Sequence, residues 1–73
     1  ERHTSNGRMD IVVQTDKYIY IMELKMDASA DEALRQIEDK GYDKPFAADP
    51  RKLFKIGVDF SSQTRRIAEW KMA

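Results

Sequence analysis

A single helical pattern lies between two blocks of strand-like sequence, and this order limits the folds that the chain can adopt. The helical pattern begins at Ser29, which has the capping-box spacing to Glu32, and it ends before Gly41. Apolar residues recur inside it at helical spacing, at Ala30, Ala33, Leu34 and Ile37. Because a helix between strands returns the chain for a crossover, this order predicts a mixed sheet with one parallel pair.

Strand-like segments rich in β-branched and aromatic residues lie on both sides of this helix. Asn6-Gly7 is a strong hairpin signal and Asp16-Lys17 a weaker one, whereas the two prolines near the middle predict a loop. The predicted segments are a strand stub over residues 1–5, strands Arg8 to Thr15 and Tyr18 to Met26, a loop Tyr42 to Pro50, a strand Lys52 to Phe60, a turn Ser61 to Thr64 and a strand Arg65 to Met72. We therefore expect an α/β (α+β) fold with the order β-β-β-α-β-β, in a single partial domain over residues 1–73.

Composition narrows the classes of function. Thirteen basic residues balance thirteen acidic ones, which excludes a polybasic arm or an acidic tail that works by bulk charge. The chain has no cysteine, so it has neither disulfides nor a thiolate site, and no apolar run approaches the roughly 20 residues of a membrane span. We expect a cytoplasmic protein without a membrane partner. Because the chain starts at Glu1, within a strand-like segment and without an initiator Met, we also expect it to be a C-terminal piece of a longer protein.

Two carboxylates face each other if the hairpin turn is centred between Asp16 and Lys17. Residues equidistant from the turn then pair, so Asp10 lies opposite Glu23 with Cβ atoms about 4.5–5.5 Å apart. Lys25 lies on the same face, because strand side chains alternate with period two. Facing like charges destabilise a sheet, and a bound Mg²⁺ would offset their repulsion. The three residues are therefore a candidate set for phosphodiester hydrolysis, with two metal ligands and a lysine that acts on the attacking water.

The same residues also admit a structural interpretation. Arg8 and Lys25 would then neutralise Asp10 and Glu23 in a solvated cluster of charges on the surface. In addition, an odd-length turn or a bulge would shift the register by one residue and place the two acids on opposite faces. The sequence alone leaves these alternatives open.

Joined together, these segments resemble the PD-(D/E)XK nuclease superfamily. The elements follow one another as they do in that family. Asp10 comes first, then an apolar strand, then Glu23-Leu24-Lys25, and then a capped helix that bears Gln36. The closer resemblance is to a branch found as the C-terminal domain behind a predicted AAA-ATPase-like domain in bacteria. It is carried over nearly the whole chain by GRMDIVV, YIYIMELKMDASADEALRQIEDKGY and FKIGVDFS. One departure is Met9, which stands where the family signature has proline.

The resemblance implies a restriction-endonuclease-like mixed sheet, here truncated without the helix that opens the family's core. It also implies a Mg²⁺- or Mn²⁺-dependent nuclease site. Asp10 and Glu23 would be metal ligands, with the Leu24 carbonyl as a further ligand. Lys25 would position or activate the nucleophilic water, and Gln36 would support the catalytic group from the helix. The implied partners are DNA or RNA and an upstream ATPase-like domain.

Three further expectations concern neighbouring residues and the rival function. Tyr42 would match a tyrosine that follows the glutamine in the family, at a longer spacing here. An apolar stripe on the reverse face of the sheet should pack under a helix, and without that helix it invites a homodimer; its members are Tyr18, Tyr20, Met22, Leu24 and Met26. The alternative to a nuclease is a non-catalytic docking or regulatory module with the same fold.

Overall fold

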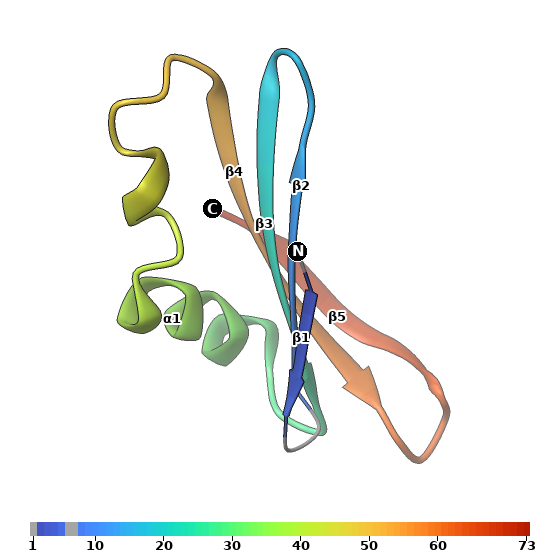
Figure 1. The fold of residues 1–73 in the computed structure, drawn as a ribbon. Helices are drawn as coiled ribbons and strands as arrows, with labels where there is room; N and C mark the ends of the chain where they lie inside the picture. Colours follow the sequence, from blue (N-terminus) through green and yellow to red (C-terminus); the bar gives the residue numbers. More distant parts are fainter. Residues whose placement is uncertain (1, 6–7) are drawn as a thin grey trace.

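The computed structural model describes residues 2–5 and 8–73, with side chains from Asp10 onward (Figure 1). Its elements are β1 (Arg2–Ser5), β2 (Arg8–Gln14), β3 (Tyr18–Met26), α1 (Ala30–Lys40), the short 3₁₀ helix η1 (Lys44–Phe46), β4 (Lys52–Ser61) and β5 (Arg66–Met72). This order confirms the predicted fold class. The predicted Asn6-Gly7 turn lies outside the described residues. The segment predicted as a loop contains η1, because Pro45 has a backbone geometry that suits the first turn of a helix.

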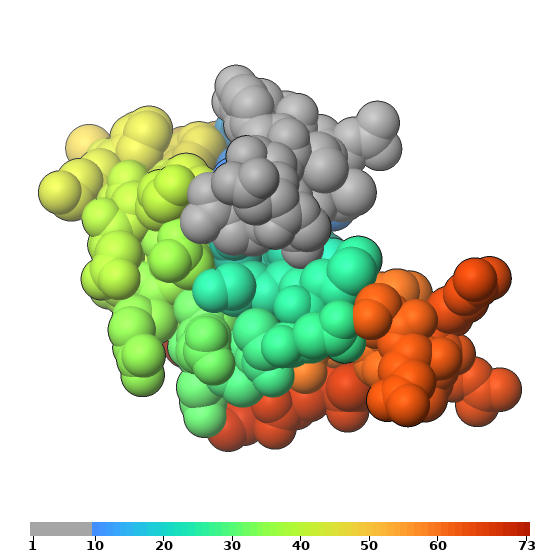
Figure 2. All heavy atoms as spheres, turned by 90° about the horizontal axis from the view of Figure 1, so that it is seen from below, coloured from blue at the N-terminus to red at the C-terminus, as the bar shows by residue number. Residues whose placement is uncertain are grey.

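The strands form one five-stranded mixed sheet in the order β1-β2-β3-β4-β5. The β3–β4 pair is parallel and the other pairs are antiparallel. The parallel pair is the one that α1 connects, as the position of the helix between strands predicts. Both α1 and η1 lie on the same side of the sheet (Figure 1), and Figure 2 shows the β4–β5 turn projecting at one end. In the described part of the chain, no helix is long and apolar enough to cross a membrane.

The core lies between α1 and the sheet. Ile19 and Ile21 of β3 and Ile37 of α1 are fully buried, and each such side chain stabilises the fold by about 1.5–3 kcal/mol. Partly buried side chains pack around these three: Val12, Leu34, Tyr42, Phe46 and Leu53. The predicted apolar stripe of α1 is therefore the face that it buries.

Side chains and backbone cap α1 at both ends. Ser29 Oγ accepts a hydrogen bond of 3.0 Å from the Glu32 N–H, and Gly41 ends the helix with a φ of 65°. This confirms the predicted boundaries. The Glu32 carboxylate differs from the prediction of a reciprocal contact with the Ser29 backbone. It accepts a 3.4 Å hydrogen bond from the Ser29 hydroxyl and lies 3.8 Å from Lys25 Nζ, because this lysine reaches toward the helix from β3.

Gly57 of β4 sets how closely α1 approaches the sheet. A Cβ atom at this position would lie 2.4 Å from the Ala30 carbonyl oxygen and 2.9 Å from the Leu34 nitrogen. The register places one residue of each strand in a single row: His3, Asp10, Glu23, Gly57 and Lys71. Because neighbours in such a row present the same face, the start of α1 covers the part of the sheet beside Glu23.

Two acidic side chains from distant strands hold the start of α1. Asp59 Oδ1 of β4 accepts a 2.9 Å hydrogen bond from the Ala28 N–H. Glu69 Oε1 of β5 accepts a 3.0 Å hydrogen bond from the Ala30 N–H. Since the first N–H groups of a helix have no partner within the helix, Glu69 completes the N-terminus of α1, whereas Asp59 holds the residue directly before the N-cap. Both carboxylates lie at the end of the helix where its dipole favours negative charge. They also tie α1 to both C-terminal strands.

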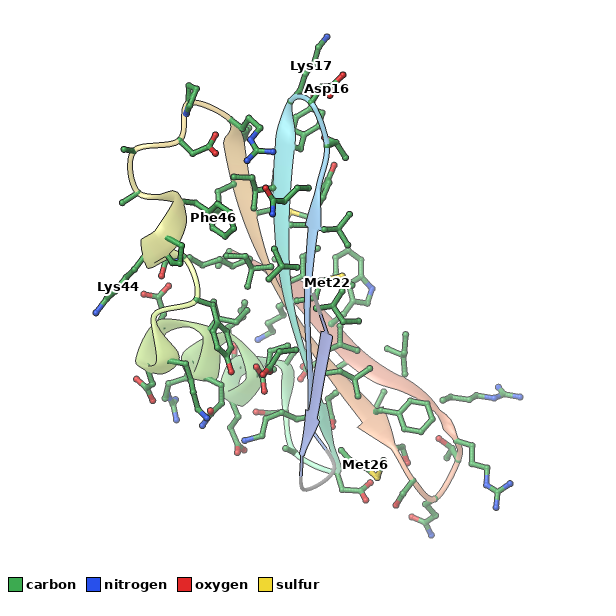
Figure 3. The ribbon with its side chains drawn as sticks, in the orientation of Figure 1. Asp16, Lys17, Met22, Met26, Lys44 and Phe46 are labelled. Carbon is green, nitrogen blue, oxygen red and sulfur yellow. The ribbon has the colours of Figure 1, made fainter. Side chains whose placement is uncertain are left out.

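The reverse face of the sheet is apolar. Met22 and Met26 project there, away from the helices (Figure 3), and Tyr20 stacks on Phe54 with ring centroids 5.3 Å apart. The described helices cover the opposite face, so the expected packing of this stripe under a helix is not met within the described residues. Large side chains on the surface include Val13, Tyr18, Met26, Ile67, Trp70 and Met72. The homodimer through this face stays a prediction.

β5 departs from the alternation that its sequence predicts. Phe60 pairs with Ile67, whereas the neighbouring Asp59 pairs with Glu69, so Ala68 is an extra residue in the ladder. This bulge puts Ile67 beside Phe60, where strict alternation with Trp70 and Met72 would have placed Ala68. Trp70 is 61% exposed on this edge strand.

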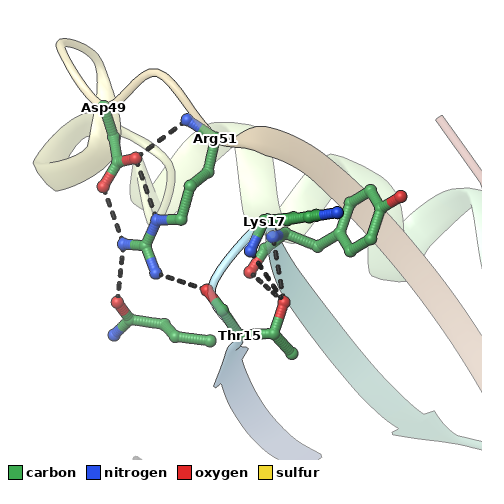
Figure 4. A network of polar contacts seen from close by, with 6 residues as sticks. Thr15, Lys17, Asp49 and Arg51 are labelled. Carbon is green, nitrogen blue, oxygen red and sulfur yellow. Dashed lines mark hydrogen bonds and ion pairs between the residues drawn. The ribbon is translucent and has the colours of Figure 1, made fainter.

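A polar network closes the end of the sheet near the β2–β3 turn (Figure 4). Arg51 donates to both carboxylate oxygens of Asp49, at 2.9 and 2.7 Å. It also donates to the Thr15 carbonyl at 3.0 Å and to Gln14 Oε1 at 2.9 Å. The Arg51 side chain and backbone hold the pKa of Asp49 down to about 2. This network fastens the turn to the segment that leads into β4.

Gly57→Ala should destabilise the protein. The added methyl group meets backbone atoms of α1, which cannot swing aside as the end of a side chain can. The expected loss is about 1–3 kcal/mol, the usual cost of an overpacked core, and thermal unfolding monitored by circular dichroism measures it. An unchanged melting temperature would contradict the close approach of helix and sheet.

Asp49→Asn should lower stability at neutral pH and lose its effect in acid. The folded state holds the pKa of Asp49 near 2, below its usual 3.8, so its contribution is complete above pH 3.8 and fades as the pH falls toward 2. Urea midpoints of wild type and variant should therefore converge over that range. Asp39→Asn, at an exposed position of α1, is the control and should show no such convergence.

Candidate functional site

Asp10 and Glu23 are direct partners in the β2–β3 ladder. The turn between the strands is the predicted two-residue Asp16-Lys17 turn, closed by a 2.8 Å hydrogen bond from the Thr15 N–H to the Tyr18 carbonyl. The predicted register is therefore confirmed, and the alternative of a one-residue shift is wrong. Both carboxylates lie on the face of the sheet that α1 covers.

This carboxylate pair is largely withdrawn from solvent. Glu23 has no exposed surface, and Asp10 is half-buried. Both carboxylate oxygens of Glu23 and Oδ1 of Asp10 are buried. The alternative of a solvated cluster of charges on the surface is thus wrong for Glu23. That alternative also included Arg8, whose side chain lies outside the described part of the chain. Burying carboxylates is costly, so a fold that does it needs compensating charge or hydrogen bonds nearby.

Tyr42 supplies one such hydrogen bond. Its hydroxyl donates to Asp10 Oδ2 at 2.7 Å. The left-handed conformation of Gly41 ends α1 directly before Tyr42 and lets the chain turn there. No spacing pattern indicated this contact, and only the family resemblance singled out the tyrosine. It brings a residue from beyond the helix to the candidate metal ligand on β2.

A charged cluster fixes the segment that carries Tyr42. Lys55 of β4 forms ion pairs with Glu38 near the end of α1 and, at 3.2 Å, with Asp43 directly after Tyr42. Glu38 is the main cause that raises the pKa of Lys55, and Lys55 in turn lowers the pKa of Asp43. The cluster therefore anchors the chain on both sides of Tyr42.

The other predicted site residues lie on β3, which also carries Glu23, and on α1. Lys25 lies two residues beyond Glu23 in β3, and its Nζ is 3.8 Å from Glu32 Oε2. Its side chain is 22% exposed, so it can reach a ligand from solvent. Gln36 is half-buried on the flank of α1, as its place beside the apolar stripe predicts. Leu24 directs its side chain to the reverse face. Because that side chain is aliphatic, the backbone carbonyl is the group of Leu24 that could bind a cation.

This donor set fits a small, hard divalent cation. In the described part of the chain, no group of three or more acidic or histidine side chains gathers as a metal cluster. Mg²⁺ nevertheless binds through one or two carboxylates and retains several waters. Asp10, Glu23 and the Leu24 carbonyl provide oxygen ligands of this type. The roles of these residues stay predictions.

Comparison with known proteins shows the family of the chain but does not test the roles of these residues. An uncharacterized protein in the vnfD 5′ region of Azotobacter chroococcum mcd 1 is 35% identical over 69 residues, which cover 92% of this chain. The chain spans only 13% of the length of that relative. No solved structure matches the chain. The sequence model of the PD-(D/E)XK nuclease superfamily matches residues 1–70, and the chain therefore belongs to this superfamily.

Proposed function

We propose that this domain is a Mg²⁺- or Mn²⁺-dependent nuclease that hydrolyses phosphodiester bonds of DNA or RNA. The observation that supports it most is the position of Asp10 directly opposite Glu23, with buried oxygens on the face under α1. Facing carboxylates are unfavourable in a sheet unless something offsets their repulsion. A divalent cation offsets it and can also polarise a phosphoryl oxygen and activate the attacking water in phosphodiester hydrolysis.

Each residue has a distinct part in the proposed reaction. A bound cation supplies Lewis-acid polarisation of the phosphoryl oxygen. Lys25 orients the attacking water and stabilises the negative charge that develops on the phosphate. Glu32, 3.8 Å from Lys25 Nζ, holds the lysine near its working position until substrate arrives.

Tyr42 has a positioning role in this proposal. Its hydroxyl donates to Oδ2 of Asp10 and so fixes the orientation of the carboxylate that is the proposed metal ligand. The Lys55 cluster holds the segment of Tyr42, so the orientation of Asp10 depends on the end of α1. Gln36 supports the site from the helix.

The rival function is a non-catalytic docking or regulatory module with the same fold. It is favoured by the finding that, among the described residues, no third acidic side chain joins the pair in a metal cluster. The two functions differ in metal binding, because only the nuclease needs Asp10 and Glu23 to hold a cation.

The proposal includes a neighbouring ATPase-like domain in a longer protein. Its support is the resemblance of the segments to a branch that stands behind such domains. The curated relative, of which this chain spans 13%, is also much longer than the matching segment. In either function, the ATPase-like domain would be the direct partner of this one.

Mn²⁺ should raise the melting temperature of the wild-type protein. A ligand that binds only the folded state at about 100 times its Kd stabilises it by about 2.7 kcal/mol. Glu23→Gln and Asp10→Asn should lose this gain, whereas Asp39→Asn on α1 should keep it. An equal shift in wild type and Glu23→Gln would refute the metal site and favour the docking module.

Lys25→Met should reduce metal-dependent cleavage of nucleic acid by at least about 100-fold, because it removes the donor that stabilises the transition state. The variant should retain the Mn²⁺-induced thermal shift, since Lys25 is not a metal ligand. Lys17→Met, at the exposed tip of the β2–β3 turn (Figure 3), is the control and should cleave normally. Equal cleavage by wild type and Lys25→Met would contradict the mechanism.

A further inference from the structure

A pocket of about 290 Å³ adjoins the Asp10 carboxylate. One wall comes from β2 and β3, and the other comes from the segment around Tyr42 and η1. Figure 3 shows Phe46 pointing from η1 toward the sheet, whereas Lys44 of the same short helix points away. The volume is close to the lower end of the range for small-molecule pockets, roughly 300–1,000 Å³, so it suits one ring system.

The lining of the pocket combines apolar walls with polar groups. Apolar walls come from Val12, Ile21, Pro45 and Phe46. Polar groups come from Asp10 and Tyr42 on the side of the candidate metal site and from Gln14. Arg51 donates to the Oε1 of Gln14 at 2.9 Å, which leaves the amide NH₂ of Gln14 as a hydrogen-bond donor for a ligand.

We propose that this pocket receives an unstacked nucleobase from the nucleotide beside the scissile phosphate. Asp10 belongs both to the pocket and to the proposed metal site, so an occupant of the pocket lies next to the reacting phosphate. A nucleobase of the same substrate can reach this position, and its apolar faces and the hydrogen-bond acceptors on its edges suit the apolar walls and Gln14. This inference rests on the function proposed above and assigns its substrate.

The pocket thereby selects the form of the nucleic acid. A base inside a duplex reaches such a pocket only after it leaves the stack, whereas a base in a single strand is already accessible. The substrate is therefore single-stranded nucleic acid, or a duplex with an unpaired base at the cleavage position. Stacking against a protein surface tolerates different bases, so we expect little sequence preference.

Binding of dAMP to the protein in the presence of EDTA tests the pocket without metal or cleavage. Titration followed by NMR should give dAMP-dependent shifts around Val12 and Phe46. Val12→Phe fills the pocket and should weaken binding at least about fivefold, the lower end expected for the loss of base stacking. Val13→Phe is the matched control, because the Val13 side chain lies on the other face, 43% exposed, and should bind dAMP normally.

Gln14→Ala is a second test that does not disturb the core, because Gln14 is exposed. It should weaken dAMP binding without a change in the far-ultraviolet circular dichroism, so the inference can be judged even if Val12→Phe does not fold. Deoxyribose 5-phosphate and inorganic phosphate should bind more weakly than dAMP. Equal binding of these base-free anions, or unchanged dAMP binding in both pocket variants, would overturn the inference.

Cleavage assays separate this inference from the proposed function. Wild-type protein with Mn²⁺ should cleave a single-stranded oligonucleotide faster than the same sequence in a duplex, and Val12→Phe should lose this preference. Metal-dependent cleavage with no dAMP binding would refute the pocket and leave the nuclease intact. Conversely, dAMP binding that depends on Val12 in a protein without cleavage would refute the nuclease and, with it, the assignment of the base to the nucleotide beside a scissile phosphate.

Discussion

Asp10 and Glu23 occupy one rung of the β2–β3 ladder, and the arrangement around them follows from this pairing. Two acids side by side on a sheet repel each other, and their repulsion grows as water is removed. The short Asp16-Lys17 turn fixes the register so that neither strand can slip to relieve it. The fold thus holds two carboxyl groups side by side, which is the arrangement that the proposed cation site needs.

The helix turns this pair of acids into a sheltered site. Gly57 has no side chain, so the start of α1 lies close to β4 beside Glu23 and removes its carboxylate from water. Asp59 and Glu69 hold the helix in this place from the C-terminal strands. At the other end, Gly41 turns the chain so that Tyr42 reaches Asp10. The start of α1 therefore shields the Glu23 carboxylate from water, and the end of α1 positions the tyrosine that contacts Asp10.

Local patterns in the sequence predicted much of this arrangement. The helix boundaries follow from Ser29 and Gly41, which act within a few residues of themselves, and the two-residue turn fixed the pairing of the acids. The parallel pair followed from chain order alone. These features depend on short-range chemistry or on connectivity, so a single sequence contains them.

Contacts between distant segments could not be predicted in the same way. The roles of Gly57, Asp59 and Glu69 depend on where α1 lands on the sheet, and no local pattern specifies that position. The bulge at Ala68 likewise interrupts an alternation that the sequence otherwise suggests. Tyr42 is separated from Asp10 by 32 residues, so only family resemblance pointed to it.

A crystal structure determined after soaking with Mn²⁺ tests the proposed metal site, since manganese is located by its anomalous scattering. We expect one manganese ion bound by carboxylate oxygens of both Asp10 and Glu23. An ion held elsewhere, or a carboxylate pair that binds none at saturating Mn²⁺, would contradict it.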